Sequence, residues 1–352
     1  MGGEKLMSSS HELKSAAKDL AIKSHLFDSH INHAVTEHLN TSKDVALKPD
    51  LFFSGHRGCA GCGPATVLRL VMKAVRGPTI VTQATGCMEI VGSIYPYTSW
   101  GLPWLHTAFE NAAANASGIE AAIKAMRRKG KIKSEHVDVI AIAGDGGTYD
   151  IGFQALSGAI ERGHDFLFVL YDNEGYMNTG IQRSGGTPIG ASTTTTPAGS
   201  VVPGKLEKKK PLTEIILAHE LEYVATATPF FWKDLVAKVQ KGLEVEGPAF
   251  LHIFAPCPRG WRTEPSKSIS YSKLAVETCV FPIWEAVKGK RVLSSPSGLY
   301  ALAPQKKKPV VEYLEGQGRF RHLFKPENKP ILDQIQQATD DRWKKLLSQC
   351  ML

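Results

Sequence analysis

The sequence predicts an α/β protein with a mostly parallel sheet and helices on both faces. The first observation is a series of short apolar runs rich in β-branched or aromatic residues, at 79–82, 137–143, 166–171, 223–226 and 249–254. The second is that stretches with helical periodicity alternate with these runs, at 64–76, 107–129, 150–162, 212–220 and 231–245. Such alternation is typical of parallel sheets, which bind ligands at the carboxyl ends of their strands.

Three regions of the chain differ in pattern. Residues 1–50 show a weak helical period within 11–39, and we interpret them as a helical N-terminal extension that contacts a partner. Residues 51–280 carry the strand–helix alternation, and residues 281–352 form a less regular C-terminal extension ending in a helix at about 328–348. Residues 181–211 contain few apolar side chains, which is typical of a functional or disordered loop.

Composition excludes several classes of protein. The net charge is +8, but the basic residues are dispersed, and we interpret the one tight run, Lys208–Lys210, as a solvated loop and not a nucleic-acid site. The positive surface is suited to attracting an acidic redox partner. No apolar run is long enough for a membrane helix, and the N-terminus lacks the apolar segment of a secretory signal. We therefore expect a cytoplasmic protein.

One group of polar residues predicts a Mg²⁺-diphosphate site. Gly144, Asp145, Gly146 and Gly147 directly follow the strand at 137–143, and Asn173 directly follows the strand at 166–171. Glycines let the backbone approach a phosphate, and a helix opening near Asp150 would aim its first amides at it. Carboxylate and amide oxygens at neighbouring strand ends suit Mg²⁺, which is usually held by protein oxygens together with substrate phosphates.

A second group consists of cysteines. Six cysteines in a large chain with no secretory signal indicate metal or redox chemistry rather than disulfides. Cys59 and Cys62 form one Cys-x-x-Cys pair, whereas Cys87 and Cys257 stand alone. Four thiolates can hold zinc or an iron–sulfur cluster, and the spacing does not decide between them. Free core cysteines are the third interpretation. The remaining two, Cys279 and Cys350, match no motif and are expected to be structural.

These motifs resemble a known family. Gly-Asp-Gly followed by Asn173 resembles the thiamine-diphosphate motif, and Tyr171–Gly180 resembles the second half of that site in pyruvate:ferredoxin oxidoreductases, within the 2-oxoacid:ferredoxin oxidoreductase family. The resemblance covers about residues 54–348 and includes Ser93–Trp100, His106–Asn111 and Glu315–Phe320. One departure is Pro64, at a position where some members have a glutamate that contacts the cofactor.

The resemblance implies a thiamine-diphosphate-binding fold and assigns roles to particular residues. Mg²⁺ would be held by Asp145, the Asn173 side chain and the Gly175 carbonyl, and Asn178 would lie by the reacting carbon. One 4Fe-4S cluster near the thiamine would be held by Cys59, Cys62, Cys87 and Cys257. The other residues that the resemblance places at the cofactor are Gly144, Gly146, Gly147 and Tyr176, with Cys87 beside it.

The implied activity is that of one subunit of a complex. It would convert pyruvate, coenzyme A and oxidised ferredoxin reversibly to acetyl-CoA, CO₂ and reduced ferredoxin. One further subunit would supply the glutamate that activates thiamine, and another would carry ferredoxin-type clusters. Neither nucleic acid nor a membrane is expected as a partner. The alternatives are an enzyme for an aryl or branched 2-oxoacid such as phenylglyoxylate, a non-redox thiamine decarboxylase, and a zinc-stapled structural subunit.

Overall fold

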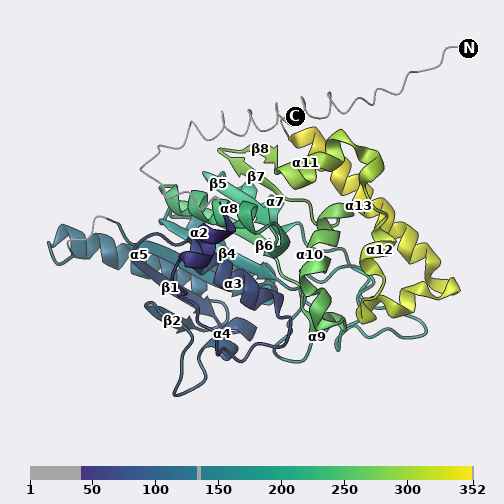
Figure 1. Ribbon diagram of the computed structural model, residues 1–352, viewed down its shortest axis with the longest axis horizontal. Coiled ribbons are helices and arrows are strands. Elements are labelled where there is room, and N and C mark those ends of the chain that lie inside the picture. Colours follow the sequence, from purple (N-terminus) through teal and green to yellow (C-terminus); the bar gives the residue numbers. More distant parts are fainter. Residues whose placement is uncertain (1–40, 133–135, 351–352) are drawn as a thin grey trace, which may run out of the picture.

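The computed structural model describes residues 41–132 and 136–350. The helical period predicted within 11–39 lies outside the described residues. The described chain is organised around an eight-stranded sheet with the strand order β2-β1-β3-β4-β6-β5-β7-β8, drawn near the centre of Figure 1. The strands are β1 (Thr79–Ala84), β2 (Trp104–Thr107), β3 (Asp138–Gly144), β4 (Phe166–Asp172), β5 (Tyr223–Ala227), β6 (Pro248–Phe254), β7 (Trp284–Val287) and β8 (Lys290–Leu293).

The pairing of the strands confirms a mostly parallel sheet. Neighbours from β2 to β5 run parallel, whereas β7 pairs antiparallel with β5 and β8 antiparallel with β7. Parallel pairing places the carboxyl ends of β1, β3 and β4 at one edge of the sheet, with Ala84, Gly144 and Asp172 as their last residues. The polar residues that follow these strands are therefore brought together.

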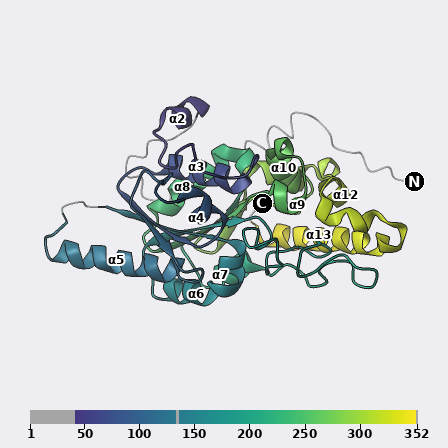
Figure 2. The same ribbon diagram turned by 90° about the horizontal axis from the view of Figure 1, so that it is seen from below.

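Helices cover both faces of the sheet, as predicted. Figure 2 shows α3 and α8 on one side and α5, α6 and α7 on the other. The helices are α2 (Ser42–Leu47), α3 (Gly63–Ala74), α4 (Cys87–Gly92), α5 (Ala112–Arg128), α6 (Phe153–Glu161), α7 (Leu212–Leu217), α8 (Trp232–Glu244), α9 (Pro258–Trp261), α10 (Ser268–Glu277), α11 (Ser295–Leu302), α12 (Val310–Leu314) and α13 (Lys329–Gln349).

The core explains why the strands have apolar sequences without alternation. Along β3, Ile140 and Ile142 belong to the core beneath α3 and α8, whereas Val139 and Ala141 belong to the core beneath α5 and α6. Because successive side chains point to opposite faces and both faces are covered, every position of the strand before its last residue, Gly144, is buried.

The structure corrects two predicted helices. The helix predicted at 107–129 begins later, at Ala112, and is α5. Thr107 is instead the last residue of β2, a four-residue strand with two exposed residues and therefore no apolar signal. The helix predicted from Asp150 begins earlier: a π-helical turn, η1 (Gly146–Ile151), directly follows Asp145, and α6 continues after it. Neither correction changes which residues end the strands.

The region after residue 280 holds a hairpin that the sequence did not predict. β7 and β8 are joined by Lys288 and Gly289, which have φ angles of 49° and 75°. Two successive positive φ values are typical of the two-residue turns that suit the twist of a hairpin. The two strands extend the same sheet beyond residue 280. The final helix, predicted at 328–348, is α13, and no helix among the described residues is long and apolar enough to cross a membrane.

Candidate active site

A cavity of about 200 Å³ lies at the carboxyl ends of β1, β3 and β4. The nine residues predicted to bind the cofactor or react all line it: Cys87, Gly144, Asp145, Gly146, Gly147, Asn173, Gly175, Tyr176 and Asn178. The other residues of its wall were not predicted from the sequence, namely Thr85, Gly86, Phe109, Tyr171, Met177 and Thr179. Thr85 and Gly86 could have been found because they directly follow β1, as Asp145 follows β3.

Asp145 is a buried carboxylate whose negative charge is not paired with a cation among the described residues. It is 1% exposed, and its Oδ2 accepts a hydrogen bond from the Ser184 hydroxyl. Within the described residues it makes no ion pair. Burial, together with the negative charge of Asp172, raises the pKa of Asp145 well above its usual range. A bound cation would remove this penalty, because it would stabilise the ionised form.

Two further groups with oxygen atoms, the Asn173 side chain and the Gly175 carbonyl, converge with this carboxylate. The outer end of the Asn173 amide lies 2.9 Å from Asp145 Oδ1 and 2.9 Å from the carbonyl oxygen of Gly175, and its NH₂ can donate to both. Rotating the amide would bring its oxygen to the same position. Oxygens about 2.0–2.1 Å from Mg²⁺ in an octahedron are separated by about 2.9 Å along each edge. The donor set and its spacing therefore fit Mg²⁺.

The helical turn after Asp145 depends on a glycine. A Cβ at Gly146 would lie 2.3 Å from Cε1 of Tyr176, so no side chain fits between the turn and this ring. The Tyr176 hydroxyl donates to Asp150 Oδ2 at 3.1 Å, and the same carboxylate oxygen accepts from the Gly185 amide at 2.9 Å. Asp150 therefore ties the turn to the two later segments that close the site.

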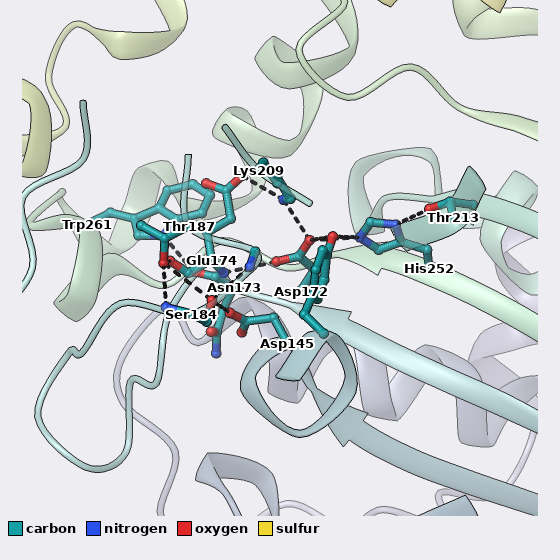
Figure 3. A network of polar contacts seen from close by, with 12 residues as sticks. Asp145, Asp172, Asn173, Glu174, Ser184, Thr187, Lys209, Thr213, His252 and Trp261 are labelled. Carbon is teal, nitrogen blue, oxygen red and sulfur yellow. Dashed lines mark hydrogen bonds and ion pairs between the residues drawn. The ribbon is translucent and has the colours of Figure 1, made fainter. Parts of the chain in front are cut away.

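A buried charged network lies behind Asn173, and it corrects the prediction that Lys208–Lys210 is a solvated loop. Lys208 is exposed, but Lys209 turns inward and its Nζ lies 2.7 Å from Asp172 Oδ2. Figure 3 shows Asp172 between Lys209 and His252, whose Nε2 is also 2.7 Å from Oδ2. Burial alone would raise the pKa of Asp172, but these two partners hold it below its usual range. Sequence analysis missed this network.

Two of the segments that carry the predicted cluster cysteines, those of Cys62 and Cys257, pack against each other. The amide of Gly63, next to Cys62, donates to the carbonyl of Pro256, next to Cys257, at 3.1 Å. A Cβ at Gly63 would lie 2.4 Å from that carbonyl oxygen, so only glycine permits this approach. Cys87 begins α4, directly after β1.

The thiols are close enough to influence one another electrostatically. Burial raises the pKa of Cys62 to about 12, with further contributions from Cys257 and Cys59. Burial and the same three neighbouring thiols also raise the pKa of Cys87. Within the described residues, no three or more Cys, His, Asp or Glu side chains converge as closely as ligands of one metal ion. The iron–sulfur assignment therefore stays a prediction. Neighbouring thiolates repel one another, and a bound cationic group would offset this repulsion.

Known proteins are similar to this chain over most of its length. Residues 84–253 match the family model of the thiamine pyrophosphate enzyme, C-terminal TPP binding domain. Pyruvate synthase subunit PorB of Methanocaldococcus jannaschii is 52% identical over 85% of this chain and 97% of the relative. The chain belongs to the pyruvate synthase PorB family. This membership confirms the resemblance that the motifs indicated, and the matched domain confirms the thiamine-diphosphate-binding fold.

Further relatives include a second PorB and a subunit of a ketoisovalerate oxidoreductase. PorB of Thermotoga maritima is 50% identical over 84% of this chain and 90% of the relative. Ketoisovalerate oxidoreductase subunit VorB of Pyrococcus furiosus is 43% identical over 87% of this chain and 96% of the relative. The matched thiamine domain contains Asp145 and Asn173 but ends before Cys257 and begins after Cys59 and Cys62. Three of the four predicted cluster cysteines therefore lie outside the matched thiamine domain.

Proposed function

We propose that this chain is the thiamine-diphosphate-binding subunit of a pyruvate:ferredoxin oxidoreductase. The complex would convert pyruvate, coenzyme A and oxidised ferredoxin to acetyl-CoA, CO₂ and reduced ferredoxin, reversibly. The observation that carries the proposal is the meeting of Asp145, Asn173 and Gly175 in a cavity that Cys87 also lines. This arrangement suits an enzyme that places an electron acceptor beside a diphosphate cofactor.

The diphosphate end of the cofactor would be held by this chain's own residues. Asp145, the Asn173 amide oxygen and the Gly175 carbonyl would hold Mg²⁺, and the backbone at Gly144, Gly146 and Gly147 would face the phosphates. When bound, thiamine diphosphate supplies a carbanion that attacks the 2-oxo carbon and accepts the electrons left when CO₂ departs. The apolar wall of the cavity, which includes Phe109 and Met177, would exclude water from the reacting atoms.

One 4Fe-4S cluster would be held by the thiolates of Cys59, Cys62, Cys87 and Cys257. When bound, the cluster supplies a one-electron acceptor. The proposal is supported by the position of Cys87, which lines the same cavity as Asp145. It is also supported by the packing of the Cys62 and Cys257 loops, since ligands that are far apart in sequence must be brought together by direct loop contacts.

The chain would act within a complex. The carboxylate of Asp145 is the only one among the described residues that line the cavity, and no glutamate lines it. The glutamate that activates thiamine would accordingly come from another subunit, and ferredoxin-type clusters from a further one. Residues 1–50 would form an extension that contacts a partner subunit. The start of a C-terminal extension at residue 281 stays a prediction. The complex would be cytoplasmic.

Pyruvate is the substrate we favour. The PorB relatives are 46–52% identical to this chain, compared with 43% for the ketoisovalerate oxidoreductase subunit VorB. The experiment is ferredoxin reduction by the purified complex with pyruvate, 2-oxoisovalerate and phenylglyoxylate in parallel, each with and without coenzyme A. We expect coenzyme A-dependent reduction with the highest kcat/KM for pyruvate. A higher kcat/KM for another oxoacid would overturn the choice of substrate, and CO₂ release without ferredoxin reduction would indicate a non-redox decarboxylase.

Asn178 provides a test of the residues near the reacting carbon. It lines the cavity and is exposed, unlike the buried Asn173, so its amide is free to face a substrate. Asn178→Ala should retain thiamine diphosphate and iron but lose about 10²–10³ in kcat, the usual effect of removing a donor aimed at a developing charge. Steady-state kinetics and cofactor analysis of the same preparation check this. Cofactor loss would show that Asn178 helps to bind the diphosphate instead.

A further inference from the structure

The residue between two of the proposed Mg²⁺ ligands has an unfavourable backbone conformation. Glu174 has a φ angle of +67°, in the left-handed region that a residue with a long side chain rarely adopts. It lies between Asn173 and Gly175, so its conformation decides whether the Asn173 amide and the Gly175 carbonyl point to the same place. Such strain persists only where the surrounding structure fixes it.

Every polar group of Glu174 is fixed. Its amide donates to Asp172 Oδ1 at 3.0 Å, and its carbonyl accepts from the Thr187 hydroxyl at 2.9 Å. Its carboxylate lies between two cations: Oε1 is 3.0 Å from Lys209 Nζ, and Oε2 is 2.6 Å from Arg319 Nη2. Figure 3 shows Lys209 above Glu174 and Asp172. Glu174 is 3% exposed and Arg319 is 2% exposed, so solvent screens these ion pairs little.

Arg319 is itself held in place by neighbouring side chains, and one of these also contacts the backbone of Asn173. The guanidinium carbon lies 4.0 Å from the centre of the Trp261 ring, and Arg319 Nε donates to the Gln317 side chain at 2.9 Å. The indole of Trp261 donates to the backbone carbonyl of Asn173 at 2.8 Å. The same group of side chains therefore fixes the backbone of Asn173 and the side chain of Glu174.

The geometry points to Lys209 and Arg319 as positioning residues for the Mg²⁺-diphosphate site, acting through Glu174. Their ion pairs hold the left-handed turn that brings Asn173 and Gly175 together beside Asp145. Neither cation belongs to the wall of the cavity, so both act on the metal ligands from behind. This inference rests on the proposed function, because it takes the three converging groups to be the Mg²⁺ ligands.

The test compares the buried Glu174 with the partly buried Glu285 in the assembled complex after removal of its cofactor and metal. Glu174→Gln keeps the size of the side chain but removes its charge. Glu285→Gln is the matched control, because Glu285 is also paired with a lysine, Lys241 at 2.9 Å, but lies on β7, away from the cavity. Calorimetry measures Mg²⁺ affinity at saturating thiamine diphosphate, and thermal unfolding measures the stability of the metal-free complex.

We expect Glu174→Gln to weaken Mg²⁺ binding about 10–100-fold, the usual effect of removing a partner that orients metal ligands. Glu285→Gln should lower the unfolding temperature but keep wild-type Mg²⁺ affinity. Wild-type affinity in Glu174→Gln, or an equal loss in Glu285→Gln, would overturn the inference. If Glu174→Gln does not assemble, Arg319→Lys takes its place, since it keeps the charge but loses the planar fork and the stacking on Trp261.

The outcome can be separated from a failure of the proposed function. Loss of cofactor in Asp145→Ala together with wild-type affinity in Glu174→Gln would leave the metal site in place and remove only the positioning role. Normal cofactor binding in Asp145→Ala would remove the metal site itself. For Arg319→Lys, we expect several-fold weaker Mg²⁺ binding with an intact fold, and wild-type affinity in this variant would also contradict the positioning role.

Discussion

Asp145→Ala is expected to abolish retention of thiamine diphosphate while the fold survives. The substitution removes the only charged ligand proposed for Mg²⁺, so the loss of affinity should exceed about 100-fold, the upper end for substitutions that act only on the surroundings of a metal. The metal-free protein should not be less stable, because this carboxylate is buried without an ion pair and ionising it there is unfavourable. Cofactor content after gel filtration and the thermal unfolding temperature measure the two effects.

The matched control for this variant is Asp138→Ala. Asp138 is also a buried carboxylate whose burial raises its pKa, but it begins β3 at the end away from the cavity, whereas Asp145 directly follows the other end of that strand. We expect this variant to retain thiamine diphosphate. Wild-type cofactor content in Asp145→Ala, or equal loss from the two variants, would contradict the assignment of Asp145 as a Mg²⁺ ligand.

Cys87→Ala is expected to lose the iron–sulfur cluster and ferredoxin reduction but to keep thiamine diphosphate. Cys87 is the one predicted cluster ligand that lines the cavity. Its thiol interacts electrostatically with Cys59, Cys62 and Cys257, which is why its removal should affect the whole cluster. Ferredoxin reduction should fall at least about 100-fold, since an electron acceptor is lost rather than reoriented. Slow CO₂ release without electron transfer should persist, because the three Mg²⁺ ligands are unchanged.

Iron content, the visible absorption spectrum and thiamine content of the same preparation measure these effects. Cys350→Ala is the control: Cys350 is a partly buried thiol next to Arg291 and not next to the other cysteines, so iron and activity should be unchanged. Full iron content in Cys87→Ala would remove this residue from the ligand set. Zinc without iron in the anaerobically purified wild-type protein would instead favour a structural metal site.

The sequence alone was enough to predict five of the eight strands and the sheet edge at which the polar residues meet. β3 and β4 are buried on both faces, so each appears as an unbroken apolar run, and the residue that follows each run lies at the carboxyl edge. This local pattern explains why Asp145 and Asn173 were placed together before their contacts were known. β2 was missed for the opposite reason: it is a short edge strand with two exposed residues, so it has no apolar run.

Tertiary structure decided which charges are buried and which partners hold them. From sequence, Lys209 was one of three adjacent lysines in a predicted solvated loop, yet it pairs with Asp172 and Glu174. Arg319 lies 145 positions from the glutamate it contacts. Such ion pairs produce no recognisable pattern in the sequence, because the sequence shows each charged residue but not the distant side chain that neutralises it. The proposed ligands Asp145 and Asn173 follow strand ends and can be predicted locally, whereas the cations proposed to hold the site in place depend on how distant segments pack.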